Sequence, residues 1–250
     1  MLKYTLPYKY TIMVILLSKG VSILLADNFN KRKNVSTRDH VYETLKESII
    51  KLDLKPGQSV SEKEISELLS VSRTPVREAF VKLAQEELLE VYPQRGTFIS
   101  LIDLEHVEEV RFIRELLERA SAKLAAERPE NVDFVSLREN LQRQRYCIEE
   151  KNYTKLFELD EEFHYIISIG AEKPRIWSVL QNFNSHLNRI RMLSLAANYN
   201  WEQILAQHMV IANAIEIGDS QLADEAMGEH LRKLRFELDS LKEEYPDYFK

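Results

Sequence analysis

Hydrophobic residues recur at every third or fourth position along most of the chain, which is the spacing of helices that bury one face. Beyond residue 102 the pattern is interrupted at short turn segments such as Pro129, Asn152 and residues 218–220. It predicts six helices, over residues 105–127, 132–151, 153–169, 174–195, 201–217 and 221–244. The sequence therefore predicts a mainly α protein whose second part is an all-α helical bundle.

Residues 36–100 show a different order of elements. Two helices are predicted, one over 38–52 and one from Ser61, which forms a capping box with Glu64. A third helix spans 74–86 with Pro75 in its first turn, where the missing N–H breaks no hydrogen bond. Alternating residues around the turn 93–96 then predict two short strands. This order is typical of a winged helix-turn-helix domain.

The chain is expected to contain three segments. Residues 35–101 form the winged helix-turn-helix domain, and residues 102–250 form an all-helical effector-binding and dimerisation domain. Residues 1–34 form a leader whose apolar stretch is interrupted at Lys19 and Gly20, so neither half reaches the ~20 residues that span a bilayer. Lys19-Gly20 must be encoded by AAR-GGN, which resembles a ribosome-binding site. We expect the leader to be disordered, or its start to be assigned too far upstream of Leu24 or Leu25.

The overall composition is that of an ordinary globular protein, with 44% hydrophobic and 30% charged residues. A net charge of −6 argues against a protein that coats nucleic acid non-specifically, so DNA binding would need a local group of basic side chains. The single cysteine, Cys147, cannot form an intramolecular disulfide and indicates a reducing, cytoplasmic location. No membrane partner is expected.

Basic and small residues stand where a winged helix touches DNA. Side chains at the start of the third helix can reach base edges in the major groove, and a small turn at the wing tip permits close approach. Basic residues at the starts of the first two helices can hold the phosphate backbone. The alternative is that these side chains only solvate helix surfaces. The candidate DNA-binding residues are Arg38, Lys63, Arg73, Thr74, Arg77, Arg95 and Gly96.

The run VSRTPVREA, residues 71–79, and the wing sequence P-x-R-G resemble the GntR family of bacterial transcription regulators. The resemblance implies that Arg73, Thr74 and Arg77 make the main groove contacts, that Lys63 and Arg38 are auxiliary, and that Gly96 is the wing contact. The sequence departs from the family where Ser70 and Glu87 replace common glycines, which puts the local cap geometry in question.

A possible metal site is distributed over the second part of the chain. Asp160 and His164 stand one helical turn apart, and His208 and His230 each fall within an apolar stripe. A hydrogen-bonded core histidine is the more ordinary interpretation of each imidazole alone, but burying Asp160 unpaired would be costly. One divalent cation would satisfy all four. Zn²⁺ or Ni²⁺ suits such a donor set, with coordination positions left for water or a ligand carboxylate.

The segments ELDEEFHYIIS and QHMVIANAIEIGDSQLADEAMGEHLRKL resemble the all-helical FCD effector domain of the FadR-like branch of the GntR family. By this resemblance the four residues above are metal ligands, and Arg114 falls at the domain's usual arginine. We expect Arg114, on an inward stripe, to pair with an effector carboxylate. The alternative is a buried ion pair with Glu118 or another neighbour.

The run NSHLNRIRMLSL, residues 184–195, resembles one subset of these domains. Asn184 and Arg191 flank its apolar stripe and are expected to line an effector pocket. His186 and Arg189 are expected to point to the side, without a functional role.

Together these patterns predict a ligand-responsive transcription regulator that is not an enzyme. It is expected to bind a palindromic double-stranded DNA operator as a homodimer, to act as a repressor, and to sense a small carboxylate with the help of a divalent metal. One alternative is a metal-dependent hydrolase with Glu161 or Glu162 as base, although both are expected to be solvent-facing spacers. Another is a constitutive DNA-binding protein with a purely structural metal.

Overall fold

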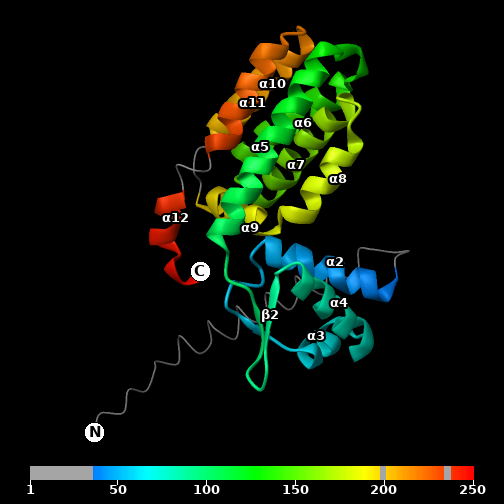
Figure 1. Ribbon diagram of the computed structural model, residues 1–250, viewed down its shortest axis with the longest axis vertical. Coiled ribbons are helices and arrows are strands. Elements are labelled where there is room, and N and C mark those ends of the chain that lie inside the picture. Colours follow the sequence, from blue (N-terminus) through cyan, green and yellow to red (C-terminus); the bar gives the residue numbers. More distant parts are fainter. Residues whose placement is uncertain (1–35, 198–200, 234–237) are drawn as a thin grey trace. The chain divides into compact units, whose positions relative to one another are not determined.

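The computed structural model describes residues 36–197, 201–233 and 238–250 (Figure 1). The expected leader, residues 1–34, lies outside these residues. The chain divides into two compact units between Ser100 and Leu101. The predicted fold class, a winged helix-turn-helix domain followed by an all-α bundle, is confirmed. Within the described residues, no helix combines the length and the apolar character that crossing a membrane requires.

In its described residues, 36–100, the first unit contains three helices and a small antiparallel sheet. Its elements are α2 (Thr37–Ile50), β1 (Ser59–Val60), α3 (Glu62–Leu69), α4 (Arg73–Gln85), β2 (Leu89–Tyr92) and β3 (Gly96–Ile99). The side chain of Ser61 caps α3 by accepting the Glu64 N–H at 3.2 Å, as predicted. Apolar residues of α2 and α4, including Val41, Ile49 and Leu83, are fully buried in the core of this unit.

The sheet of the first unit has the strand order β1-β3-β2. Leu89 lies opposite Ile99 and Tyr92 opposite Gly96, so β2 and β3 form the predicted wing. The strand β1 was not predicted, because two residues are too few to show alternation.

Within its described residues, the second unit consists of helices joined by loops and short 3₁₀ turns. Its helices are α5 (Leu104–Glu127), α6 (Phe134–Glu149), α7 (Tyr153–Gly170), α8 (Pro174–Phe183), α9 (Ser185–Ala196), α10 (Trp201–Glu216), α11 (Ser220–Arg232) and α12 (Leu238–Glu244). Helices α5, α6, α7, α10 and α11 pack side by side as a bundle (Figure 1). Its core contains Phe163, Ile211 and Met227, all fully buried.

The prediction of one helix over residues 174–195 is wrong. Helix α8 ends at Phe183 and α9 begins at Ser185, with a bend at Asn184 where ψ is −2°. No Gly or Pro stands at the bend, and the helical spacing of hydrophobic residues continues across it, so the sequence shows no break there. The bend turns α9 across the end of the bundle (Figure 1). Residues 221–244, also predicted as one helix, hold α11 and α12, with residues 234–237 between them outside the described residues.

Two residues that replace family glycines adopt left-handed backbone conformations. Ser70, which ends α3, has φ 54°, and Glu87, just after α4, has φ 58°. Such a conformation costs roughly 1–2 kcal/mol in a residue that carries a Cβ. The turns therefore form as glycine-type caps, although the residues that form them are strained.

Replacing Ser70 with Gly should relieve this strain. We expect Ser70→Gly to stabilise the first unit by about 0.5–1 kcal/mol, since the relief exceeds the extra chain entropy that Gly loses on folding. Native-state hydrogen exchange of the α3 and α4 amides would measure the change. Ser70→Ala keeps the Cβ and is the control. Equal stability of the two variants would contradict the strain argument.

Candidate metal centre and ligand cavity

Four side chains meet inside the helical bundle. Asp160 and His164 come from α7, His208 from α10 and His230 from α11. One possible ligand atom from each lies within 4.8 Å of the others. His230 Nε2 is 3.3 Å from Nε2 of both His164 and His208, and His208 Nε2 is 3.5 Å from Asp160 Oδ1. The structure therefore brings together all four residues that the sequence proposed as ligands.

Hydrogen bonds behind the imidazoles determine which ring nitrogen carries the proton. Asn140 donates through Nδ2 to the Leu159 carbonyl at 2.9 Å, which leaves its Oδ1 to accept from Gln144 Nε2 at 2.7 Å. Gln144 thus presents Oε1 to His208 Nδ1, 2.8 Å away. Because a carbonyl oxygen only accepts, His208 donates through Nδ1 and its Nε2 keeps a lone pair.

The other two imidazoles are held in the same way. His164 Nδ1 contacts a carboxylate oxygen of Glu118 on α5, and His230 Nδ1 lies 3.2 Å from Gln207 Oε1. Both acceptors place the proton on Nδ1 and leave the Nε2 lone pair pointing to the centre of the cluster. Burial lowers the pKa of His208 to about 3 and also takes the pKa of His230 well below its ordinary value. His208 and His230 are therefore neutral at neutral pH.

The carboxylate of Asp160 is ionised although it is buried. Burial alone would raise its pKa, but Arg191 and, to a smaller extent, the three surrounding histidines together hold the pKa well below its ordinary value. Three imidazole lone pairs and one carboxylate thus face a common point. Acceptors that face one another without a donor are unfavourable, and a single proton can bridge one pair at most. The donor set fits a divalent cation.

Arg191 of α9 binds two neighbouring carboxylates of α7. Its guanidinium pairs with Asp160 through one terminal nitrogen and with Glu161 through the other. The Glu161 side chain is 17% exposed and also accepts from Gln181 at 2.7 Å. The expectation that Glu161 faces solvent is therefore wrong, because α8 and α9 cover that side of α7. Glu162 is exposed, as expected.

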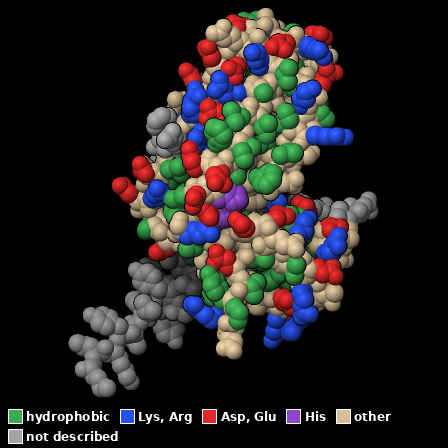
Figure 2. Space-filling model, in the orientation of Figure 1, with side chains coloured by type: hydrophobic (Ala, Val, Ile, Leu, Met, Phe, Trp, Pro, Cys, Tyr) green, Lys and Arg blue, Asp and Glu red, His purple; other side chains and the backbone are tan. Residues whose placement is uncertain are grey.

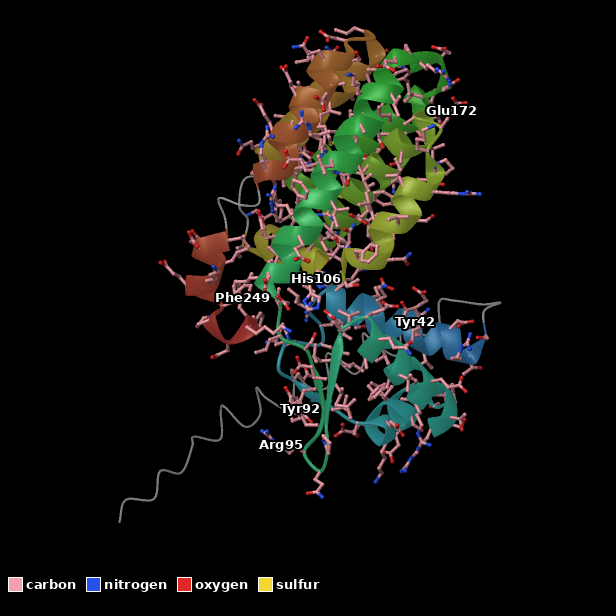
Figure 3. All side chains as sticks on the ribbon, in the orientation of Figure 1. Tyr42, Tyr92, Arg95, His106, Glu172 and Phe249 are labelled. Atoms are coloured by element: carbon pink, nitrogen blue, oxygen red, sulfur yellow. The ribbon has the colours of Figure 1, made fainter. Side chains whose placement is uncertain are left out.

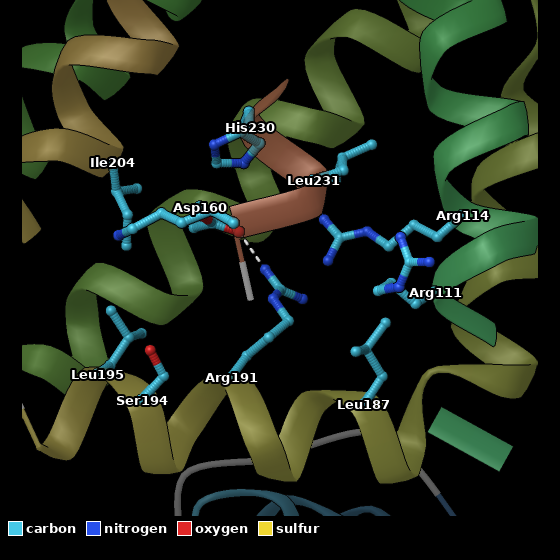
Figure 4. A pocket seen from close by; sticks show the side chains of 11 residues that line it. Arg111, Arg114, Asp160, Leu187, Arg191, Ser194, Leu195, Ile204, His230 and Leu231 are labelled. Carbon is cyan, nitrogen blue, oxygen red and sulfur yellow. Dashed lines mark hydrogen bonds and ion pairs between the residues drawn. The ribbon is translucent and has the colours of Figure 1, made fainter. Parts of the chain in front are cut away.

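A partly open cavity lies beside Asp160 and His230 (Figure 4). One part of its wall is apolar and another is basic; α5 and α9 supply three of the four Arg and Lys side chains, and α9 supplies two of the four apolar ones. The lining residues are Arg111, Arg114, Asp160, Leu187, Arg191, Ser194, Leu195, Ile204, His230, Leu231 and Lys233. The candidate metal centre thus lies at the edge of a space that can hold a small molecule.

Arg114 both forms an ion pair and lines this cavity. Its Nε donates to Glu118 Oε1 at 2.5 Å, so the ion pair given above as the alternative does form. Its Nη2 is buried and lacks a hydrogen-bond partner within the part of the chain that the structure describes. Burial would raise the pKa of Glu118, but the charge of Arg114 and the contact with His164 Nδ1 lower it to about 2. One edge of the guanidinium is therefore anchored, and the other can donate to an anion.

Three other residues near α9 differ from their sequence-based interpretation. Asn184 lies at the junction of α8 and α9, is 1% exposed, and is absent from the cavity lining found among the described residues. His186 and Arg189 are buried, and their side chains bind the segment 101–103. Sequence reasoning missed this pair because polar residues in an amphipathic pattern are normally assigned to the surface.

The candidate DNA-binding residues lie on the surface of the first unit. Arg73 and Thr74 occupy the first turn of α4 and are exposed, while Arg77 is held by Glu62 of α3 through contacts of 3.2 Å. Lys63 and Arg38 are exposed at the starts of α3 and α2. Figure 2 shows Lys and Arg side chains gathered around α3 and α4.

The wing presents the remaining two candidates. Arg95 extends from the turn between β2 and β3, with its guanidinium 5.5 Å from the ring centre of Tyr92 (Figure 3). Gly96 has φ +111°, which a residue with a Cβ rarely adopts. The tight wing tip therefore depends on this glycine.

Comparison with known proteins identifies both units. Residues 37–99 match the family described as "Bacterial regulatory proteins, gntR family", and residues 109–233 match the FCD domain. The "HTH-type transcriptional repressor RspR" of Escherichia coli K12 is 34% identical over 84% of this chain and 92% of its own length. The chain belongs to the GntR family. It is a bacterial DNA-binding transcription regulator with an FCD effector domain, so the hydrolase interpretation is wrong.

Other GntR regulators show similar sequences or folds. The "Uxu operon regulator" of Haemophilus influenzae is 26% identical and covers 89% of this chain and 91% of its own length. The solved structure of E. coli McbR/YncC superimposes with a TM-score of 0.71 over 85% of this chain and 100% of its own, at 21% identity. At that identity the structural likeness supports the fold alone.

Proposed function

We propose that this GntR regulator is a cytoplasmic repressor that binds a palindromic operator as a homodimer and responds to a small organic acid. The response depends on a divalent metal held by Asp160, His164, His208 and His230. The observation that carries the proposal is the convergence of their lone pairs beside a cavity. The relative RspR is a transcriptional repressor by name, which supports repression as the mode of action.

Zn²⁺ or Ni²⁺ is the metal that this donor set favours, since neutral imidazoles and a carboxylate suit borderline divalent ions. Such an ion supplies Lewis acidity and further coordination positions for a ligand oxygen. The chain's own residues orient the site: Gln144, Gln207 and Glu118 fix the imidazole tautomers, and Arg191 balances the charge of Asp160. The alternative of a purely structural metal does not account for the adjoining cavity.

The cavity favours a short molecule with a carboxylate. The buried Nη2 of Arg114 offers N–H groups, and a guanidinium recognises carboxylates through such groups. Leu187, Leu195 and Leu231 provide an apolar wall for a carbon chain. Arg191 also lines the space, although its guanidinium already binds two carboxylates. Asn184 lies at the bend before α9 and would act on the cavity only indirectly, by supporting that helix.

DNA recognition is assigned to the exposed start of α4 and to the wing. Arg73, Thr74 and Arg77 would enter the major groove, where arginine reads guanine through paired hydrogen bonds. Lys63 and Arg38 would contact phosphates, and Arg95 and Gly96 would approach the duplex from the wing. A palindromic operator needs two copies of this unit related by a two-fold axis.

The second copy is proposed to dock on an exposed apolar face of the FCD domain. Phe112 and Leu116 of α5 are 58% and 53% exposed, and Val179 and Phe183 of the adjoining helix α8 are 44% and 50% exposed. Hydrophobic side chains run along this face in Figure 2. A contiguous apolar face of this kind is typical of a protein interface. A self-complementary contact there would place two DNA-binding units in one particle.

Metal and ligand binding can be tested together by metal analysis and a thermal-shift screen of organic acids. We expect one Zn²⁺ or Ni²⁺ per chain and a stabilisation by one class of short carboxylates that a chelator abolishes. Gln144→Leu removes the acceptor behind His208 and should weaken metal affinity about 10- to 100-fold. Arg114→Met should keep the metal and lose the acid-dependent shift. Absence of metal under all loading conditions would contradict the proposal.

The groove contacts can be tested on an operator that the full-length protein selects from random DNA. Arg73→Ala and Arg77→Ala should each weaken specific binding by about 1–3 kcal/mol, since each removes a base-reading guanidinium. Arg128→Ala is the matched control, because Arg128 is equally exposed and ion-paired, in its case to Glu172 of the FCD domain. Fluorescence anisotropy would give the affinities. Equal effects of all three changes would exclude the assignment.

The dimer face can be tested by placing a charge on it. Leu116→Glu should convert the dimer to a monomer, because an unpaired carboxylate would be buried in the apolar contact. Val135→Glu, at a position 65% exposed on α6, is the control and should leave the dimer intact. Sedimentation velocity distinguishes the two states. A Leu116→Glu protein that sediments as wild type would place the interface elsewhere.

A further inference from the structure

The segment that follows the DNA-binding unit is held by the C-terminus of the chain. Ile102 donates its N–H to the Tyr248 carbonyl at 2.8 Å, and Lys250 donates its N–H to the Ile102 carbonyl at 3.1 Å. These bonds form a short parallel β-bridge between Ile102 and Phe249, and the Ile102 side chain is fully buried. We call residues 101–103 the joint and residues 248–250 the strap.

Helix α9 binds the joint from its other side. Arg189 donates through Nη2 to the Leu101 carbonyl at 3.2 Å, and the backbone N–H of Asp103 donates to His186 Nδ1 at 3.1 Å. Arg189 is 0% exposed and His186 is 1% exposed. Because both side chains are buried, breaking either bond would leave a buried polar atom without its partner, which is costly. The joint is therefore tied to the position of α9.

The same helix also forms a wall of the ligand cavity. At 3.6 residues per turn, the cavity residues of α9 point roughly away from His186 and Arg189. One of them, Arg191, is bound to Asp160 at the candidate metal centre. The cavity residues of α9 are Leu187, Arg191, Ser194 and Leu195.

Helix α5, which forms the facing wall, begins at the joint. Asp103 caps it by accepting the N–H groups of Glu105 and His106, and the Lys250 side chain lies 3.1 Å from the second carboxylate oxygen of Asp103. Arg111 and Arg114 follow on α5 two and three turns later. Both walls of the cavity are thus anchored at the same three residues.

We propose that the joint carries the state of the cavity to the DNA-binding unit, with α9 as the moving element and the strap as the restraint. This inference rests on the proposed function, because it describes how that same cavity regulates DNA binding. A cation that binds Asp160, or an anion that binds Arg191, competes with the ion pair between these residues and so shifts α9 relative to α5. Helix α9 then moves the joint through Arg189 and His186. Coupling of this kind is reciprocal, so loosening the joint changes the cavity.

The strap allows a test that leaves the cavity and the core intact. Lys250→Pro removes the N–H that binds the Ile102 carbonyl and suits the extended backbone of Phe249, which has ψ 152°. Lys250→Ala is the matched control, because it removes the side chain and keeps the N–H. Hydrogen exchange of the full-length protein is measured by mass spectrometry, without metal and with Zn²⁺ alone. Zn²⁺ affinity is measured separately on the same variants.

Without metal, Lys250→Pro should speed exchange at Ile102 and also in α9, by at least about threefold relative to Lys250→Ala. Faster exchange confined to the joint, or unchanged exchange everywhere, would overturn the inference. If the wild-type protein binds Zn²⁺, Lys250→Pro should change the affinity for Zn²⁺ by at least threefold and Lys250→Ala should leave it unchanged. Equal affinities of the two variants would also overturn the inference. Failure of Zn²⁺ to bind the wild-type protein counts against the proposed metal centre, and the metal-free exchange still decides the joint.

Discussion

Four buried hydrogen-bond acceptors face one another inside one helical bundle, and the packing of the FCD domain depends on this constraint. Each of the three imidazoles directs its Nε2 lone pair toward the cluster. This is possible because the Nδ1–H of each ring donates to an acceptor outside the cluster. The outward partners come from α5, α6 and α10, so the cluster involves every helix of the bundle. A shift of one helix would leave a buried polar atom unpaired, at a cost of about 1–3 kcal/mol. The site therefore also fixes the positions of the helices relative to one another along their axes.

The polar core connects the cavity to the candidate metal centre through shared partners. Glu118 binds Arg114 with one oxygen and His164 with the other. An anion that engages Arg114 alters how strongly Glu118 polarises His164, because the two bonds draw on the same carboxylate. Arg191 forms a second connection, since it shares its charge between Asp160 and Glu161. A ligand in the cavity can thus influence the cluster from two sides.

Much of this architecture could be predicted from the sequence, and the exceptions have physical causes. Periodicity located the helices, and isolated polar residues in apolar stripes pointed to Asp160 and the three histidines. Periodicity could not reveal the bend at Asn184, because a bend in αR backbone changes direction without changing residue spacing. The buried position of Arg189 and the partly covered position of Glu161 were equally hidden, since a charged residue leaves the surface only when a partner distant in sequence compensates it.

The ion pair between Arg77 and Glu62 has a consequence for how the regulator finds its site. The DNA-binding unit carries a key arginine that its own glutamate partly neutralises, within a protein of net charge −6. Under the proposed DNA contacts, binding would release Glu62 from Arg77, and because the pair is exposed this costs at most about 1 kcal/mol. A base that pairs with the Arg77 guanidinium compensates for this cost and a mismatched base does not, so the ion pair would raise the selectivity of the contact.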